Sequence, residues 1–356
     1  MDKLFEPFHI RGVEIKNRIC MPPCVRYNLC GEDGCVSDEN VEHYRALAKG
    51  GAGLIIQEAT CVDPRGKLAH RQLGVWSDEQ IPGLKRIADA IHQEGTPVFM
   101  QIHHAGVVGI EEAAMLCPSD FELVHRGMLK RGREMTTDEI REAQRAFVSA
   151  ALRAAKAGYD GVELHGCHQY LVCQFYNNRV NRRTDAYGSN PSLFALETLE
   201  MVRQEVPKSF VVGIRLGAFE PTLADGISHA KELAAHGIDF INVSYGFYGE
   251  DEPSRPEAFP HKDVVFAAGE IKKDVDCAVF AVNGIKSADD ARDILSRTGV
   301  DMACIGRGML INPGWANDAG AGRDTGRCLD CAGCFWRSDS SACPGRELYR
   351  KTAATL

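Results

Sequence analysis

GVELHGCHQY, residues 161–170, joins a short apolar strand to a group of polar side chains. Its two histidines, His165 and His168, stand three residues apart, and Tyr170 follows two residues later. Imidazole rings can donate hydrogen bonds to a substrate oxygen, and a tyrosine hydroxyl can deliver a proton. Grouped at a strand end, these side chains predict an electrophilic pocket with a proton donor. The alternative is a loop in which the same side chains only cap backbone groups.

Short apolar runs alternate with amphipathic stretches along the whole chain, which is typical of a parallel α/β fold. We expect eight strands, at residues 18–22, 53–58, 98–102, 161–165, 211–216, 240–244, 278–282 and 302–305. Helices are expected between them, for example at 38–49, 78–93, 137–156, 224–236, 262–273 and 288–297. Eight such units predict a (β/α)8 TIM barrel with its chemistry at the C-terminal strand ends. A doubly wound sheet is the alternative, but residues 21–24 lack the glycine-rich dinucleotide fingerprint that it requires.

Local signals mark the ends of the predicted helices. Four helices follow a residue that makes a good N-cap: Ser37, Ser77, Thr136 and Ser287. Glycines that we expect to end helices stand just before the next strand: Gly50, Gly95, Gly158, Gly237 and Gly299. Two strand-to-helix loops, at residues 103–136 and 167–190, are long and are expected to cover the site.

Composition limits the class of protein. The chain has 356 residues, of which 44% are hydrophobic and 25% charged, as in ordinary soluble globular proteins. A net charge of −8 gives no electrostatic reason to expect binding to nucleic acid or to an anionic membrane. No apolar run approaches the ~20 residues of a transmembrane helix, and the N-terminus resembles no signal peptide. We therefore expect a cytoplasmic protein in which the ten scattered cysteines of the 14 are reduced and form no disulfide framework.

From His165 onward the sequence resembles the Old Yellow Enzyme family of FMN-dependent ene-reductases, a group of NADH:flavin oxidoreductases. Residues 165–175 match the family pattern H-x-x-H-x-Y-L-x-x-Q-F, and residues 181–188 match N-x-R-T-D-x-Y-G. The resemblance extends over residues 3–315. It implies that hydride passes from NAD(P)H, via flavin N5, to a carbonyl-activated alkene such as an enone or enoate. It further implies that His165 and His168 hold the carbonyl oxygen, that Tyr170 protonates the substrate, and that the protein is a homo-oligomer.

An isoalloxazine ring needs polar partners along one edge, and its phosphate needs backbone amides and a cation. Arg215, at the end of the fifth strand, is expected to stabilise the anionic reduced flavin. Gly284 and Arg307 follow the seventh and eighth strands, where barrels commonly bind phosphate. The alternative for Gln101 and Arg215 is an internal polar layer of the barrel. The resemblance implies this cofactor-binding set: Pro22, Pro23, Cys24, Ala59, Gln101, His165, Arg215, Asn283, Gly284, Gly306 and Arg307.

The chain also departs from the family pattern. Val25 stands where many members place a threonine or cysteine beside the flavin carbonyl, so we expect a different flavin potential. Val107 replaces the arginine of the usual H-A-G-R, and residues 190–194 replace the usual E-N-R-x-R-F. Tyr27 takes a position where some relatives have a tyrosine that faces the substrate, so Tyr27, His165 and His168 are the expected substrate-binding residues.

Four cysteines lie within 16 residues near the C-terminus: Cys328, Cys331, Cys334 and Cys343. Such a group can hold a [4Fe–4S] cluster or a structural zinc ion, the alternative being four unligated thiols. The family branch of 2,4-dienoyl-CoA reductase and trimethylamine dehydrogenase has a cluster here with spacing near C-x2-C-x3-C-x11-C. The spacing in this chain is shorter, and we favour a [4Fe–4S] cluster over zinc. The predicted domains are an FMN-binding barrel, residues 1–316, and a cysteine-rich metal- or cluster-binding tail, residues 317–356.

Several functional alternatives stay open. In that branch an FAD/NAD(P)H-binding portion follows the cluster, whereas this chain stops at Leu356. Electrons are therefore expected either from NAD(P)H directly or from a separate electron-donor protein. An FMN/Fe–S dehydrogenase of an amine would need an aromatic cage, for which Tyr27, Phe247 and Tyr248 are candidates. A non-enzymatic electron-transfer subunit is a further alternative. A phosphate-binding aldolase-type barrel would need a Schiff-base lysine at a strand end, and the sequence offers none.

Overall fold

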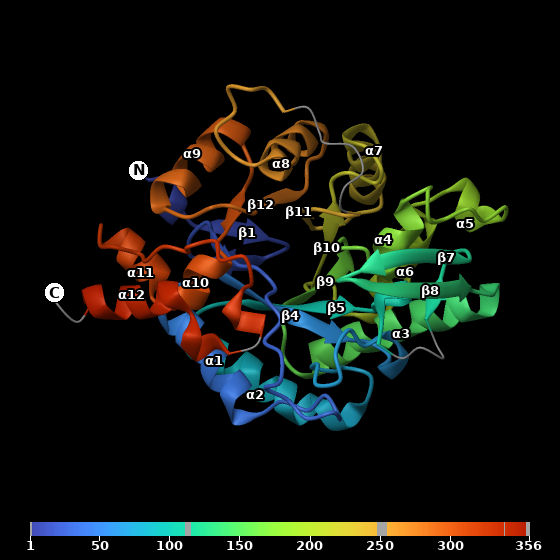
Figure 1. Cartoon of the computed structure of the whole chain (residues 1–356), viewed down its shortest axis with the longest axis horizontal. Helices are drawn as coiled ribbons and strands as arrows, with labels where there is room; N and C mark the ends of the chain where they lie inside the picture. Colours follow the sequence, from blue (N-terminus) through green and yellow to red (C-terminus); the bar gives the residue numbers. More distant parts are fainter. Residues whose placement is uncertain (1, 111–114, 248–254, 338, 354–356) are drawn as a thin grey trace.

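A computed structural model describes residues 2–110, 115–247, 255–337 and 339–353. Eight parallel strands close into one barrel, in which each strand pairs with its neighbours in sequence order (Figure 1). The structure thus confirms the predicted (β/α)8 barrel, and the predicted strands shift by at most a few residues at their ends. The barrel strands are β3 (Ile19–Met21), β4 (Leu54–Cys61), β5 (Val98–His103), β9 (Gly161–Gly166), β10 (Val211–Gly217), β11 (Phe240–Ser244), β12 (Ala278–Val282) and β13 (Met302–Cys304).

Helices cover the outside of the barrel, and three of the four predicted N-caps begin an outer helix. Ser37, Thr136 and Ser287 each form a capping box. Ser77 caps the short 3-10 turn η3 (Asp78–Gln80) instead, because Pro82 in the next turn has no N–H to continue the helical ladder. The outer helices are α1 (Asp38–Lys49), α2 (Ile81–His92), α3 (Thr137–Lys156), α6 (Leu193–Glu205), α7 (Leu223–Ala235), α8 (Asp263–Asp274) and α9 (Ala288–Thr298).

Gly50 ends α1 as predicted, but it does not take the left-handed conformation. Gly50 has a φ of −71°, and the left-handed residue after α1 is the next one, Gly51, with a φ of 91°. The chain needs a glycine at both positions, because Gly50 packs against the carbonyl of Pro313 and Gly51 against Asn317. The other glycines predicted at helix ends, Gly95, Gly158, Gly237 and Gly299, have positive φ.

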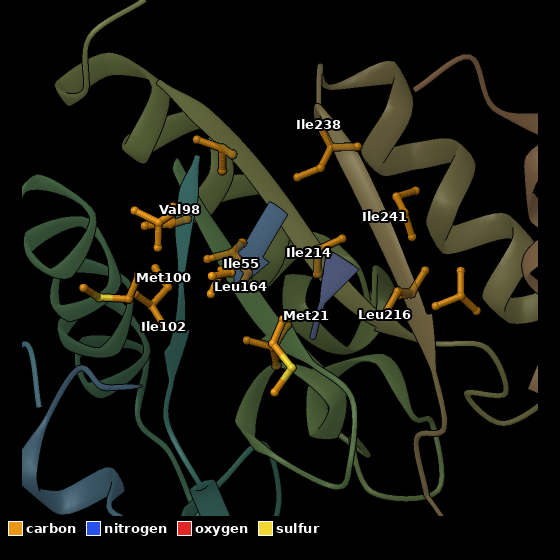
Figure 2. Close-up of a cluster of buried hydrophobic side chains, with 14 of the residues drawn as sticks. Met21, Ile55, Val98, Met100, Ile102, Leu164, Ile214, Leu216, Ile238 and Ile241 are labelled. Carbon is orange, nitrogen blue, oxygen red and sulfur yellow. The ribbon is translucent and has the colours of Figure 1, made fainter. Parts of the chain in front are cut away.

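Side chains alternate along each barrel strand between the helices and the barrel interior. On β5, Val98, Met100 and Ile102 belong to the hydrophobic layer between strands and helices (Figure 2). The intervening residues face inward: Phe99 lies in the inner hydrophobic cluster, and Gln101 and His103 contact side chains of β9. The same alternation on every strand stacks the inward residues in layers along the barrel axis.

Aromatic rings fill the end of the barrel opposite the C-terminal strand ends. Phe240 stacks between Phe99 and Phe280, with ring centroids 5.4 and 4.8 Å apart. Below them lies an N-terminal hairpin of β1 (Phe8–Ile10) and β2 (Val13–Ile15), whose isoleucines join the same cluster. Our prediction missed this hairpin because its strands are only three residues long.

Two further features lie at the other end of the barrel. A three-stranded sheet of β6 (Leu116–Cys117), β7 (Phe121–His125) and β8 (Met128–Glu134) was missed within the loop after β5. Its signal is the alternation of FELVH around the two-residue turn Arg126-Gly127, both in left-handed conformation. After β9, the predicted loop contains the short helices α4 (Leu171–Tyr176) and α5 (Ala186–Ser189).

The C-terminal segment packs against the barrel beside α1 (Figure 1). It contains α10 (Arg307–Ile311), α11 (Trp315–Gly320) and α12 (Pro344–Ala353), and α11 crosses the predicted domain boundary. Trp336 belongs to the main hydrophobic core and lies between the guanidinium groups of Arg26 and Arg346, at 4.7 and 5.3 Å. Across the described ranges, every helix is too short or too polar to cross a bilayer.

Gly213 tests the packing of the aromatic plug. A Cβ built on this residue would overlap the ring of Phe240, whose position is fixed by the neighbouring rings. We expect Gly213→Ala to lower the free energy of unfolding by about 1–3 kcal/mol, as overpacking does in other cores. Equilibrium urea unfolding measures this change. Gly333→Ala, where a Cβ meets no atom within 4 Å, is the matched control and should leave stability unchanged.

Candidate active site

A single cavity of about 440 Å³ lies at the C-terminal ends of the barrel strands. It brings together, from separate strands and loops, all the cofactor-binding, substrate-binding and catalytic residues predicted from the sequence for the barrel. These residues are Pro22, Pro23, Cys24, Tyr27, Ala59, Gln101, His165, His168, Tyr170, Arg215, Asn283, Gly284, Gly306 and Arg307. The volume lies within the range of small-molecule and cofactor sites.

A buried polar layer lies within the barrel beside this cavity. Gln101 donates a hydrogen bond of 2.7 Å to Glu163, and Asn242 donates one of 2.9 Å to the other oxygen of the same carboxyl group. Burial raises the pKa of Glu163 to about 7, and Arg215 opposes that rise. Gln101 therefore belongs both to the internal polar layer and to the cavity wall, so the two interpretations of this residue are compatible.

Arg215 supplies a buried positive charge at the wall of the cavity. Its terminal nitrogens lie 3.4 Å from the carbonyl oxygen of Pro23 and 3.4 Å from the hydroxyl of Ser244. Its Nε is buried and has no hydrogen-bond partner among the described residues. A guanidinium with an unused buried donor fits an acceptor group of a bound molecule.

Three histidines and a serine form a row of hydrogen bonds at the next level of the barrel. The Nδ1 atoms of His103 and His165 lie 3.0 Å apart, and Nε2 of His165 lies 3.2 Å from Nδ1 of His168. Nε2 of His168 lies 2.8 Å from the hydroxyl of Ser244. Burial holds the pKa of each of these histidines well below its usual range, so all three imidazoles are neutral at pH 7.

Tyr170 packs directly on this row. Its ring lies edge-on to His103 and His165, with centroids 4.4 and 4.6 Å away. The segment that presents it contains two non-glycine residues in left-handed conformation, His168 and Gln169, with φ of 57° and 69°. The N–H of His168 donates to the carbonyl of Tyr245 at 3.0 Å, which helps to hold this strained turn.

Glycines and cations line another part of the cavity. Gly284 has a φ of 73° and lies after β12, and Gly306 precedes α10. Arg307 and Lys286 both line the cavity, and both form ion pairs with the carboxylate of Asp330, at 2.7 Å for Arg307. One anionic group held by two cations beside glycine-bearing loops is the electrostatic arrangement that a phosphate group requires.

The four tail cysteines line one small cavity of about 30 Å³. Cys328 and Cys334 line the large cavity as well, so the two cavities share a wall. Within the described ranges, one group of three possible metal-ligating side chains has its ligand atoms all within 4.8 Å of one another. It consists of His165, Cys167 and His168. Burial raises the pKa of the Cys167 thiol, which opposes its ionisation to a metal-binding thiolate.

The sequence matches a known family over most of its length. The profile described as NADH:flavin oxidoreductase / NADH oxidase family matches residues 3–326. The chain belongs to this family. An NADH oxidase of Thermoanaerobacter brockii is 38% identical over 350 residues, and the match covers 93% of this chain and 53% of that protein. An NADPH dehydrogenase of Geobacillus sp. (strain WCH70) is 36% identical, with 88% of this chain and 92% of that protein covered.

Solved structures of NADH:flavin oxidoreductase-like proteins share the fold. A 2-naphthoyl-CoA reductase in complex with 2-naphthoyl-CoA superposes with a TM-score of 0.83 and 26% identity, covering 90% of this chain and 52% of that one. An Old Yellow Enzyme homologue from Zymomonas mobilis has a TM-score of 0.80 and 24% identity, covering 96% and 99%. Thus the chain spans about half the length of some of the oxidoreductases that it matches, and nearly all of others.

Among the cavity or near-cavity residues that the sequence prediction missed are His103, Ser244, Arg126 and Lys286. His103 and Ser244 are inward-facing strand residues, so the alternation of β5 and β11 could have indicated them. Arg126 lies at the tip of the β7–β8 hairpin, within 3.5 Å of the Tyr27 hydroxyl, and was missed together with that hairpin. Lys286 follows Gly284 closely, but its pairing with Asp330 has no local signal.

His104 predicts how stability depends on pH. Its Nδ1 accepts a hydrogen bond from the N–H of Gly106 at 3.0 Å, and burial lowers its pKa to about 4. Between about pH 4 and 6.5 the unfolded chain binds one more proton at His104 than the folded chain, so the free energy of unfolding rises with pH in this window. Asparagine can accept the same hydrogen bond without titrating. We therefore expect His104→Asn to reduce the slope of unfolding free energy against pH by about 1.4 kcal/mol per unit.

Urea unfolding of the two proteins at several pH values between 4.5 and 8 measures this difference. Above about pH 6.5 the slopes of the wild type and of His104→Asn should converge, because His104 of the wild type is then neutral in both the folded and the unfolded chain. An identical slope in the variant across the acidic range would contradict the assignment of a depressed pKa to this residue.

Proposed function

We propose that this member of the NADH:flavin oxidoreductase family is an FMN-dependent ene-reductase. It uses NAD(P)H to reduce a C=C bond that is conjugated to a carbonyl group, as in enones and enoates. The observation that carries the proposal is the composition of one cavity, in which His165, His168 and Tyr170 share the wall with Arg215 and the glycine- and cation-bearing loops. The names of relatives, NADPH dehydrogenase and NADH oxidase, support a nicotinamide donor.

The chain's own residues fit FMN in three respects. The unused buried donor of Arg215 fits the polar edge of an isoalloxazine ring. The cation pair of Arg307 and Lys286 fits the phosphate, and Asp330 stands in for that anion in the structure. Gly306 leaves room beside Cys24, because a Cβ there would already contact its Sγ at 3.4 Å. When bound, FMN supplies the hydride acceptor and donor that this reaction requires.

The histidines suit recognition of a carbonyl oxygen. Neutral imidazoles each carry one N–H, and His165 and His168 both reach the cavity. Hydrogen bonds from these rings would stabilise the negative charge that develops on the oxygen during reduction. Tyr170, held against the same rings, would donate the proton to the carbon next to the carbonyl group.

The amine-dehydrogenase alternative depends on an aromatic cage. Of the three candidates, Tyr27 lines the cavity. Phe247 packs on Phe121 of the hairpin, at 6.4 Å between centroids, and Tyr248 lies outside the described residues. Among the described residues, one of these three candidates therefore lines the cavity, and the proposal is made for the ene-reductase.

The test of the function uses protein purified without air. We expect a flavin absorption spectrum, bleaching on addition of NADH or NADPH, and reoxidation on addition of 2-cyclohexenone with formation of cyclohexanone. Bleaching by dithionite but not by NAD(P)H would assign electron delivery to a separate donor protein. A colourless protein that binds no added FMN would refute the proposal.

The phosphate end gives a paired prediction. Arg307→Ala removes one charge-assisted hydrogen bond to the phosphate and should weaken FMN binding by about tenfold. Asp330→Asn should instead strengthen FMN binding by about twofold to fivefold, because a partly exposed carboxylate no longer competes for Arg307 and Lys286. Fluorescence titration of apoprotein with FMN measures both. Equal affinity in the wild type and Arg307→Ala would contradict this placement of the phosphate.

Tyr170 gives a prediction about the proton. Tyr170→Phe keeps the ring against His103 and His165 but loses the hydroxyl. We expect the rate of enone reduction to fall by about 10²–10⁴-fold, the usual contribution of a general acid. Flavin reduction by NAD(P)H should stay within twofold, because it needs no proton from this group. Stopped-flow measurement separates flavin reduction by NAD(P)H from enone reduction by the reduced flavin. A selective loss in flavin reduction would exclude Tyr170 as the proton donor.

We further propose that the four tail cysteines hold a [4Fe–4S] cluster. Their convergence on one small cavity supports a shared centre. A tetrahedral zinc site would need its sulfurs about 3.8 Å apart, from Zn–S bonds of ~2.3 Å, and no three of these sulfurs are gathered within 4.8 Å. A larger cluster accepts wider spacing. Arg307 and Trp336 line both cavities, which would place the cluster next to the flavin site.

Metal analysis tests this proposal. Anaerobically purified protein should contain about four irons and four sulfides per chain. Cys331→Ser should lose the iron, while FMN should stay bound because Arg215, Gly284 and Arg307 all lie outside the tail. Cys35→Ser, a half-buried thiol away from the tail, is the control and should keep its iron. One zinc per chain, or no metal, would overturn the assignment of a cluster.

A further inference from the structure

His103 is the one member of the histidine row that does not line the cavity. It faces inward from β5, two residues beyond Gln101, and its side chain is fully buried behind His165 and Tyr170. Its Nδ1 lies 3.0 Å from Nδ1 of His165, and its Nε2 is buried without a hydrogen-bond partner among the described residues. A residue in this place can act on a substrate only through its neighbours, and its hydrogen bond goes to His165.

The unpartnered Nε2 decides where His103 carries its proton. A neutral imidazole has one N–H and one lone pair. A buried N–H without an acceptor is the more costly of the two possible orphans, and such groups are rare in folded proteins. The proton therefore sits on Nδ1 of His103, where it can donate to His165. Nδ1 of His165 must then accept, so the proton of His165 is on its Nε2.

We propose that His103 is a positioning residue that fixes His165 as the Nε2–H tautomer. This N–H points toward His168 in the structure, at 3.2 Å, and His165 borders the cavity. Resting on the proposed function, a substrate carbonyl oxygen would compete with Nδ1 of His168 for this N–H, and would find the proton on Nε2 with no change of tautomer on binding.

The same order of donors continues beyond His165. Nδ1 of His168 accepts from the Nε2–H of His165, so the proton of His168 is on its own Nε2 and is donated to the hydroxyl oxygen of Ser244. Arg215 donates to the same oxygen. The row thus runs in one direction from His103 to Ser244, and His103 sets the tautomer of both histidines that line the cavity.

Nitrogen NMR tests the tautomer without reference to activity. In FMN-loaded protein labelled with ¹⁵N-histidine, the signals of His165 are assigned by their loss in His165→Asn. We expect the pattern of an Nε2–H imidazole for His165 in the wild type and a mixture of tautomers in His103→Leu. An Nδ1–H pattern for His165 in the wild type would overturn the proposal.

Kinetics test the role. His103→Leu should lower kcat/KM for 2-cyclohexenone by about tenfold and leave flavin reduction by NAD(P)H within twofold. His103→Asn keeps a donor near the position of Nδ1 and should restore both the Nε2–H pattern and the rate to within threefold. His229→Leu, at a buried histidine of α7 outside the cavity, controls for lost stability and should leave both readouts unchanged.

The two measurements separate the two proposals. If the wild type reduces no enone, the proposed function fails and the NMR result alone decides the role of His103. If enones are reduced but His103→Leu keeps the Nε2–H pattern and the wild-type rate, the role of His103 is refuted. Failure of His103→Asn to restore the tautomer would refute it as well, because a donor at that position would then be insufficient.

Discussion

The closure of eight parallel strands into one barrel is the constraint on which the rest of this protein depends. A strand turns every second residue inward, and closure brings the inward residues of neighbouring strands to common levels. The lowest level is the stack of Phe99, Phe240 and Phe280. A polar level around Glu163 follows, and above it the row of His103, His165 and Ser244. The site is the uppermost level of a packed interior, so its side chains are held by the same contacts that hold the core.

Burial gives the two parts of the cavity different electrostatic characters. The imidazoles are enclosed, and desolvation keeps them neutral, so they serve as hydrogen-bond donors and acceptors rather than as charges. Arg307 and Lys286 are only partly buried, and both form ion pairs with the carboxylate of Asp330. A molecule with an uncharged reactive end and an anionic end would match both parts at once.

Segments outside the barrel complete the site. The β7–β8 hairpin places Arg126 at the cavity and is tied to the active-site turn by a hydrogen bond of 3.0 Å between His125 and Gln169. The tail closes another side, where Trp336 stacks with Arg26 of the loop after β3. Both segments contact residues that also line the cavity. Changes in either can therefore alter the site without changing the barrel.

The sequence by itself determined the strands, most helix ends and the position of His165, His168 and Tyr170 at a strand end, because alternation, capping and short motifs are local properties. Only the tertiary structure decided which side chains meet. His103 and His165 are 62 residues apart in sequence, and Lys286 and Asp330 are 44 apart. The register between β5 and β9 creates the first pair, and the return of the tail to Lys286 creates the second. Such pairings depend on the packing of the whole barrel, so no local pattern could specify them.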